Sequence, residues 1–141
     1  MQWSSKHNAG FCSSDATPWL PVPPSYKERN VESELQNPDS LLNCYKRFLK
    51  ARKETPSLNS GDIKIIDIKD ASEDILSYLR TVIVNGKEQN AYVFLNYSDK
   101  TNVFTNPSKK AKLLVSTNID RKNINKEKIS LDPQEGIVLI N

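Results

Sequence analysis

The sequence contains few of the residues that build metal sites and disulfides. Its 141 residues include only two cysteines, Cys12 and Cys44, and a single histidine, His7. A structural zinc site takes about four such ligands, and no CxxC pattern is present. We therefore expect no metal and no cofactor. We also expect both cysteines to be free thiols, which favours a reducing compartment.

Long hydrophobic runs and a surplus of one charge are also missing. No stretch approaches the about 20 apolar residues that span a bilayer, and no signal-peptide pattern opens the sequence. The 20 Lys and Arg side chains are nearly balanced by 17 Asp and Glu, for a formal net charge of +3. A phosphate-binding face needs a concentrated basic excess. We expect neither a membrane nor a nucleic acid as partner, and a cytoplasmic protein.

The opening segment has no regular hydrophobic period. Its first 36 residues contain the stretches "MQWSSKHNAGF" and "PWLPVPPSY". The prolines at 18, 21, 23 and 24 fix φ and remove backbone donors, which disfavours both helices and central strands. The tryptophan, leucine and valine side chains between these prolines need a surface to cover them. We predict an irregular arm that lies against another part of a protein.

A helix is predicted next, by "NPDSLLNCYKRFLKARKETP". Apolar side chains recur at a 3.6-residue period, and basic residues crowd the second half, where they suit the helix dipole. Asp39 is the candidate N-cap and Pro56 the stop signal. We expect a helix from Ser40 to Glu54.

After Gly61 the period changes to two. The segments are short, rich in β-branched and aromatic residues, and separated by turn signals. Asn85-Gly86 predicts a tight hairpin between two long strands. The expected fold of this half is an antiparallel sandwich, with strands in "DIKIIDIK", "DILSYLRTVIV", "NAYVFLNYS", "NVFT", "AKLLVST", "KISL" and "GIVLI".

Several of these segments resemble one enzyme family in their order and spacing. "MQWSSKHNAGF", "PWLPVPPSY", "NVESELQNPDSLLNCYKRFLKARKETPSLNSGD", "LNYS" and "LDPQEGIVL" are similar to the C-terminal part of α-glucosidases and oligo-1,6-glucosidases of the α-amylase superfamily, glycoside hydrolase family 13. The sequence departs from the family at Ser4, where an acidic residue is common, and at Ser25, where asparagine is common.

The resemblance implies an α+β fragment of a larger enzyme. Residues 1–58 would be a late βα loop and the last helix of a (β/α)8 barrel, and residues 59–141 a C-terminal antiparallel β-sandwich domain. The loop around Trp3 would approach the active-site face of the barrel, which makes Trp3 a possible substrate-side residue. The parent would hydrolyse short α-glucosides of an oligosaccharide substrate.

None of the family's catalytic carboxyl groups falls within this sequence, since the resemblance places them upstream. A retaining glycosidase needs two carboxyls about 5–5.5 Å apart. Glu32 and Glu34 lie two residues apart in what reads as an extended polar linker, so we expect them to point in different directions. We therefore expect no catalytic residue in this chain and no activity from the chain alone.

Other candidate residues have structural interpretations that we favour. Trp19 is expected to pack against the barrel and its last helix, and His7 to bond to backbone or solvent. Tyr78 and Arg80 share one strand face and are expected to stack or donate hydrogen bonds.

At the end of the sequence, Pro133 is expected to start a tight turn between two strands and Gly136 to adopt a positive φ near its exit. Ile137 and Leu139 would face the sandwich interior, and Val138 and Ile140 the opposite side, toward the barrel.

Two alternatives remain open at the level of sequence. Heavy subunits of heteromeric amino-acid transporters share the barrel-plus-sandwich organisation without needing catalytic acids, and they resemble "MQW…NAGF" and "LLVSTN…LDPQEG". A free-standing β-module that binds carbohydrate or protein is the other alternative.

Overall fold

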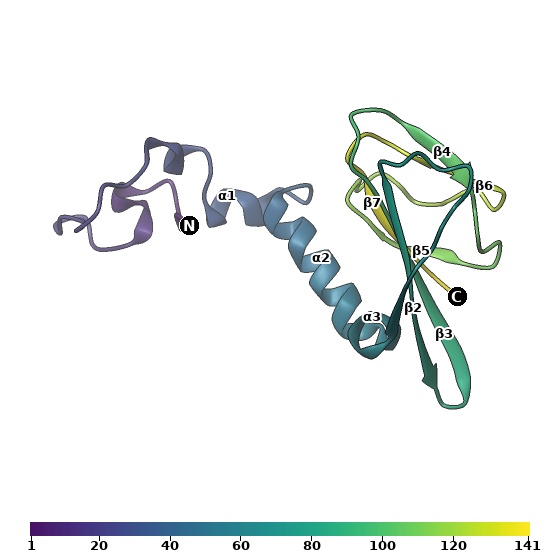
Figure 1. Ribbon diagram of the computed structural model, residues 1–141. Helices are drawn as coiled ribbons and strands as arrows, with labels where there is room; N and C mark the ends of the chain where they lie inside the picture. Colours follow the sequence, from purple (N-terminus) through teal and green to yellow (C-terminus); the bar gives the residue numbers. More distant parts are fainter. The chain divides into compact units, whose positions relative to one another are not determined.

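The computed structural model describes all 141 residues, which divide into two compact units, Met1–Arg47 and Phe48–Asn141 (Figure 1). Helix α2 (Leu41–Glu54) contributes residues to both units. A mainly antiparallel fold with few helices is confirmed. The predicted domain boundary between residues 58 and 59 stays a prediction.

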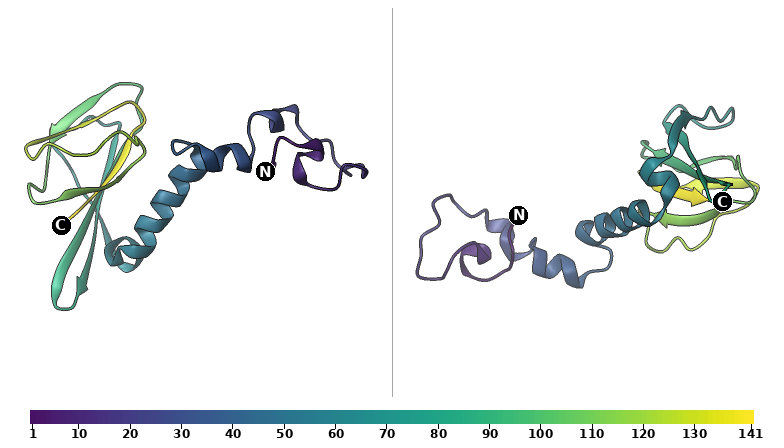
Figure 2. Two further views of the ribbon diagram at one scale, coloured as in Figure 1. Left: turned by 180° about the vertical axis from the view of Figure 1, so that it is seen from behind. Right: turned by 90° about the horizontal axis from the view of Figure 1, so that it is seen from below.

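The first unit consists of loops, two short 3-10 helices and one short α-helix ahead of α2. The elements are η1 (His7–Gly10), η2 (Pro24–Lys27) and α1 (Val31–Gln36). Figure 2 shows residues before α1 winding through successive turns in both views. The irregular arm is confirmed up to Asn30, but the prediction that it continues to residue 36 is wrong, because Asn30 caps a helix there.

Helix α2 begins one residue later than predicted and is capped by a different side chain. Ser40 accepts the Asn43 N–H with its hydroxyl at 3.2 Å, whereas Asp39, the predicted cap, does not. Pro56 ends α2 as predicted, yet it also occupies the first turn of a further helix that was not predicted, α3 (Pro56–Ser60). Proline suits this position because the first helical N–H groups have no intrahelical partner. None of the helices is long and apolar enough to cross a membrane.

All seven predicted strand segments are strands. They are β1 (Asp62–Ile65), β2 (Ile75–Val84), β3 (Lys87–Asn96), β4 (Asn102–Thr105), β5 (Lys112–Ser116), β6 (Lys128–Leu131) and β7 (Gly136–Ile140). A five-stranded sheet has the order β1-β2-β3-β7-β5, and β4 pairs with β6 in a second sheet. Every pairing is antiparallel.

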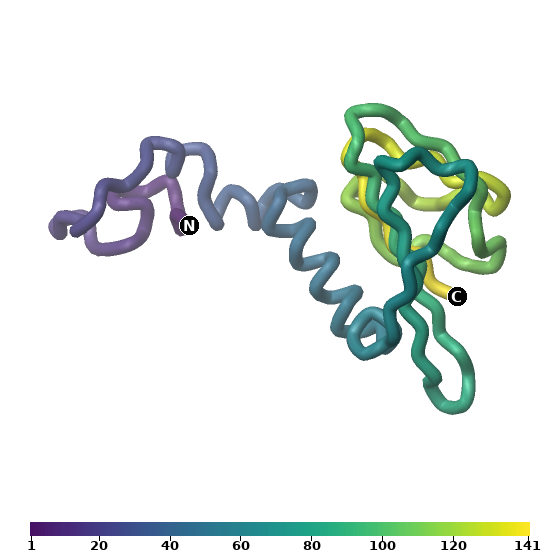
Figure 3. The backbone as a smooth tube through the Cα atoms, in the orientation of Figure 1, coloured from purple at the N-terminus to yellow at the C-terminus, as the bar shows by residue number.

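The predicted hairpin joins β2 to β3 through Asn85 and Gly86. Both residues have positive φ, 50° and 74°, as a two-residue turn matched to strand twist requires. Val84 pairs with Lys87 directly across the turn. The tip of this hairpin extends beyond the segments that pair with β1 and β7 (Figure 3).

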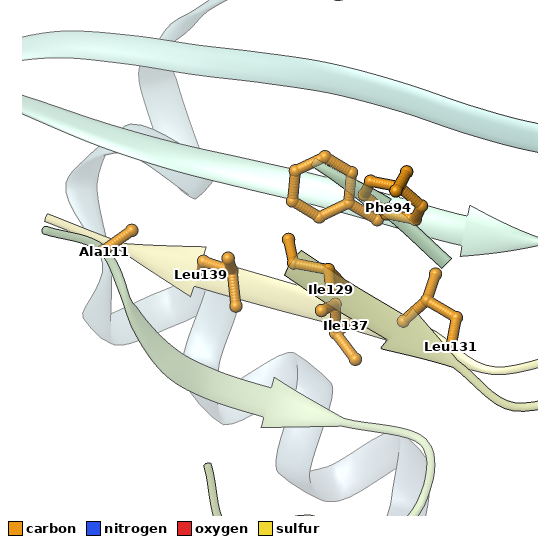
Figure 4. Close-up of a cluster of buried hydrophobic side chains, with 7 residues drawn as sticks. Phe94, Ala111, Ile129, Leu131, Ile137 and Leu139 are labelled. Carbon is orange, nitrogen blue, oxygen red and sulfur yellow. The ribbon is translucent and has the colours of Figure 1, made fainter. Parts of the chain in front are cut away.

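The main core lies between the two sheets. Phe94, Ile137 and Leu139 from the large sheet meet side chains from the small sheet, and all are buried (Figure 4). The rings of Phe94 and Phe104 lie with centroids 5.3 Å apart in a tilted arrangement. The cluster comprises Phe94, Phe104, Ala111, Ile129, Leu131, Ile137 and Leu139. The predicted inward orientation of Ile137 and Leu139 is confirmed.

The opposite face of the large sheet carries a second cluster. Val138 points to this side, as predicted, but the chain's own helices cover it. Leu58 of α3 belongs to the same cluster, and Phe48 and Ala51 of α2 pack against it. Because Phe48, Ala51 and Leu58 belong to the segment 1–58 that is predicted to be the end of the barrel, the expectation that Val138 faces a barrel stays a prediction. Val138 is buried without any further domain.

The connection before β7 differs from its prediction. Gln134, not Gly136, adopts the positive φ, at 54°. A Cβ at Gly136 would lie 2.9 Å from Cδ2 of Leu95, so a larger residue there would require the Leu95 side chain to shift. The segment also crosses from the small sheet to the large one, because β6 and β7 do not pair with each other.

A buried ion pair anchors this crossing. The Glu135 side chain is 3% exposed, and its Oε2 accepts from Nη2 of Arg121 at 2.6 Å and from the Asp132 N–H at 2.9 Å. Its Oε1 accepts from Ser116 Oγ at 2.8 Å and from Nε of Arg121. Both carboxylate oxygens are thus satisfied. Burial alone would raise the pKa of Glu135, but these hydrogen bonds outweigh it and hold the pKa below its usual value.

We predict that Leu139→Ala lowers the free energy of unfolding of the chain by about 2–5 kcal/mol, because it leaves a cavity in the core between the sheets. Urea unfolding measures the change. Lys128→Ala on an exposed site should cost little, and Leu114→Ala, which removes the same atoms from a partly exposed position, should cost clearly less than Leu139→Ala. Equal midpoints for Leu139→Ala and Leu114→Ala would contradict the assignment of Leu139 to the core.

We also predict that Glu135→Gln destabilises the chain at pH 7 by about 1.5–3 kcal/mol, because the buried charge-assisted hydrogen bonds to Arg121 are lost while Arg121 keeps only the more distant Asp132 carboxylate, at 3.9 Å. Since the folded-state pKa of Glu135 is lowered, its contribution is present above the unfolded pKa of about 4.3 and disappears as the pH falls through the lower folded value. The wild-type and variant stability curves should therefore converge in acid.

The matched control for this experiment is Glu127→Gln, which removes an exposed carboxylate paired with Lys109 at 2.6 Å. An exposed pair of this kind contributes about 0–1 kcal/mol. A parallel pH dependence for wild type and Glu135→Gln in urea unfolding would show that the buried pair does not govern acid stability.

Candidate functional site: the N-terminal loop

The backbone around Trp3 is held on both sides. Its N–H donates to the Ala9 carbonyl at 2.9 Å, and its own carbonyl accepts from the Glu32 N–H at 3.0 Å. The Gln2 carbonyl accepts from the Val31 N–H at 2.9 Å. These two carbonyls thus satisfy the first N–H groups of α1, which have no partner inside the helix.

The cap of α1 is completed by Asn30. Its Oδ1 accepts the Ser33 N–H at 2.8 Å, while the Asn30 N–H donates to Ser33 Oγ at 3.4 Å, which forms a reciprocal capping box. Asn30 is buried and also donates through Nδ2 to the Tyr26 carbonyl at 2.9 Å. The opening segment around Gln2 and Trp3, η2 and α1 are therefore joined at the start of α1 by hydrogen bonds.

A left-handed turn supports Trp3 from the other side. Asn8, Ala9 and Gly10 have φ of 56°, 52° and 76°. Buried Asn8 stabilises the turn by donating through Nδ2 to the carbonyls of Ser13 and Ala16, at 2.7 and 2.8 Å. Glycine suits position 10, because its φ is positive and an added Cβ would lie 3.1 Å from Cβ of Trp3.

The indole rings of both tryptophans face outward. Trp3 is 58% exposed on its anchored backbone, and Trp19 is 92% exposed. Trp19 lines an apolar hollow of about 560 Å³ together with neighbours between Phe11 and Pro23. Within the chain Trp19 therefore does not pack on a helix, and its predicted packing on a barrel stays a prediction.

The two neighbouring glutamates belong to α1 and not to the extended linker expected from sequence. Glu32 and Glu34 still diverge, because residues two apart on a helix do not face each other. Glu34 has a structural role instead, since its Oε2 accepts the Leu42 N–H at the start of α2, at 3.0 Å. That these two carboxyl groups do not form a catalytic pair stays a prediction.

Three carboxyl groups of the chain have a shifted pKa, and in each case the pKa is lowered. The pKa of Asp15 is lowered by a hydrogen bond from Ser13, that of Asp70 by hydrogen bonds from Thr105, and that of Glu135 is lowered as described above. A general acid working near neutral pH needs a raised pKa. These three groups are suited to structural pairing and not to proton donation.

Arg80 and Tyr78 have the structural roles that were predicted. Arg80 donates to the Gly61 carbonyl at 2.7 Å and to the Leu58 carbonyl at 2.8 Å, which satisfies the end of α3. Tyr78 packs against the second cluster. His7 is exposed in the loop, and Cys12 and Cys44 are both free, as expected.

The first unit has no hydrophobic core of its own. Ala9 is the only buried hydrophobic residue before residue 48, and the buried polar residues there are asparagine and serine. Hydrogen bonds, and not apolar burial, hold this unit together. Most of its large apolar side chains are exposed, namely Met1, Trp3, Phe11, Trp19, Leu20, Leu35, Leu41 and Tyr45.

The sequence profile described as "Alpha amylase, catalytic domain" matches residues 1–61. Among curated proteins, the chain is similar to an oligo-1,6-glucosidase from Parageobacillus thermoglucosidasius, at 39% identity over 123 residues. That match covers 85% of this chain and 20% of the relative. An oligo-1,6-glucosidase from Bacillus cereus is 32% identical over 98% of this chain and 24% of its own length.

Among solved structures, the chain is similar to isomaltulose synthase from Klebsiella sp. LX3, with a TM-score of 0.80 at 27% identity. The superposition covers 99% of this chain and 24% of the synthase. The chain thus spans about a fifth to a quarter of the length of the proteins that it matches.

We predict that amide hydrogen exchange is faster in residues 1–36 of the chain than in residues 91–97. The first segment has almost no apolar burial, whereas β3 lies between two partner strands and two clusters. Protection follows the free energy of local opening. Equal protection in the two segments would show that the opening arm is stabilised by a partner surface within this chain.

Proposed function

The chain belongs to the α-amylase family, glycoside hydrolase family 13, and we propose that it forms the C-terminal part of a retaining α-glucosidase or oligo-1,6-glucosidase. One observation carries this proposal. Residues 1–47 hold a well-defined backbone by hydrogen bonds but expose most of their large apolar side chains. Such a surface is suited to burial against a larger body, because apolar area removed from water stabilises by about 25 cal/mol per Å².

The body that covers this surface is, in our proposal, the remainder of a (β/α)8 catalytic barrel. The catalytic-domain profile extends over residues 1–61, which include the exposed arm and all three α-helices. Residues 1–58 would supply a late loop and the last helix of that barrel. Residues 59–141 would be the β-sandwich domain, and their core between two sheets supports an autonomous role.

The reaction would be hydrolysis of short α-glucosides with two carboxyl groups supplied by the rest of the barrel. The contribution of this chain would be to close the barrel and to position the loop at Trp3. An exposed indole on a residue whose backbone N–H and carbonyl are both hydrogen-bonded is suited to contact a sugar ring without losing much conformational freedom. We propose the cytoplasm as the location.

The predicted alternative, a heavy subunit of an amino-acid transporter, gains no support from the relatives described above. These relatives are glucosidases and a sugar-converting synthase. A free-standing β-module does not account for the exposed apolar side chains of residues 1–47.

A chimera tests the proposal directly. This chain would replace the matching segment of the oligo-1,6-glucosidase from P. thermoglucosidasius, and hydrolysis of an aryl α-glucoside would be measured for the chimera and for the chain alone. We expect turnover by the chimera and none by the chain alone, because the carboxyl pair lies outside this sequence.

Two results would contradict the proposal. One is a correctly folded chimera without activity, and the other is turnover by the isolated chain that survives replacement of Glu32 and Glu34.

In the active chimera, Trp3→Ala should lower kcat/KM by about tenfold or more, a loss of about 1.4 kcal/mol or more. His7→Ala, an exposed neighbour in the same loop, serves as its matched control.

A further inference from the structure

We propose that the second unit carries a binding subsite for a neutral sugar ring, in a hollow at the end of β3. The hollow has a volume of about 470 Å³ and is lined by Leu95, Asn96, Tyr97, Thr117, Gln134, Glu135 and Gly136. This size is in the range of small-molecule pockets, about 300–1,000 Å³. Its lining comes from β3, from the loop after β5 and from the crossing into β7.

Tyr97 provides an aromatic wall. It follows the last residue of β3 and is 68% exposed, although the strand residues before it are largely buried. Its backbone is fixed, since the Tyr97 N–H donates to the Asp74 carbonyl at 3.0 Å. An exposed ring on a fixed backbone offers a flat apolar face at a small entropy cost.

The floor is apolar and owes its depth to a glycine. Gly136 lies opposite Leu95 in the β3–β7 ladder. A Cβ at position 136 would lie 2.9 Å from Cδ2 of Leu95, so any larger residue there would displace the leucine. Leu95 is partly buried and packs against the edge of the second cluster, beside the part of the sheet that α3 covers. This end of the same sheet face stays open as the hollow.

The rim is polar but presents no free charge. Among the residues that line the hollow, only Glu135 and Tyr97 carry ionisable groups. Both carboxylate oxygens of Glu135 already accept hydrogen bonds, from Arg121, Ser116 and the Asp132 N–H. Gln134 is exposed next to Glu135 in the chain. Its backbone N–H donates to the Ser98 carbonyl at 3.1 Å.

These features select the class of ligand. A phosphate or a carboxylate would need an available cation, and a metal ion would need free carboxylates. Neither is offered by this lining. A ligand with one apolar face and a ring of hydroxyl groups satisfies an aromatic wall, an apolar floor and an amide rim together. A pyranose ring of an α-glucoside has this character, which makes the hollow a carbohydrate subsite on the β-domain.

The test is a titration of the full chain with isomaltotriose and, separately, maltotriose, followed by amide chemical shifts. We expect saturable binding in the millimolar range, with the largest shifts at Thr117, Gln134 and Gly136. Tyr97→Ala should weaken binding at least tenfold, whereas Tyr97→Phe, which keeps the ring face, should retain it.

The matched control is Tyr45→Ala, which removes a tyrosine of similar exposure, 62% against 68%, from α2. Urea unfolding verifies that Tyr97→Ala keeps the fold. The proposal is overturned by absence of saturable binding, by Tyr97→Ala binding like wild type, or by an equal loss in Tyr45→Ala. Because no catalysis is measured, the result is independent of whether the chimera hydrolyses glucosides.

Discussion

The structure of the second unit depends on β7, which must be buried on every side. Its backbone pairs with β3 on one edge and with β5 on the other. Its alternate side chains fill two different spaces, with Ile137 and Leu139 between the sheets and Val138 beneath α3. The Glu135–Arg121 pair stabilises the point where the chain enters this strand. Strand order, both clusters and the buried charge are therefore consequences of one central strand.

The sequence was most informative where one local rule decided the structure. Seven strands followed from their two-residue period, and the hairpin followed from Asn85-Gly86, because only a few residue types tolerate two successive positive φ values. The inward orientation of Leu139 followed from alternation along a strand. In each case neighbouring residues alone carry the signal.

Prediction failed where a distant contact was decisive. Helix α1 is stabilised in part by the carbonyls of Gln2 and Trp3, about 30 residues earlier, which accept from its first N–H groups. The ion pair of Glu135 joins residues 14 apart across a crossing between sheets. The hollow beside Tyr97 is assembled from three separate segments. No local pattern marks any of these contacts.

The position of β7 also affects how the chain folds while it is being made. About 40 residues separate the end of β3 at Asn96 from the start of β7 at Gly136. At a rate of synthesis of about 5–20 residues per second, about 2–8 s pass between the synthesis of β3 and that of its partner strand β7. During that time β3 and then β5 present unpaired, apolar edges of the kind that promotes association between chains. The long β2–β3 hairpin, complete before this interval begins, leaves β3 with one unpaired edge instead of two.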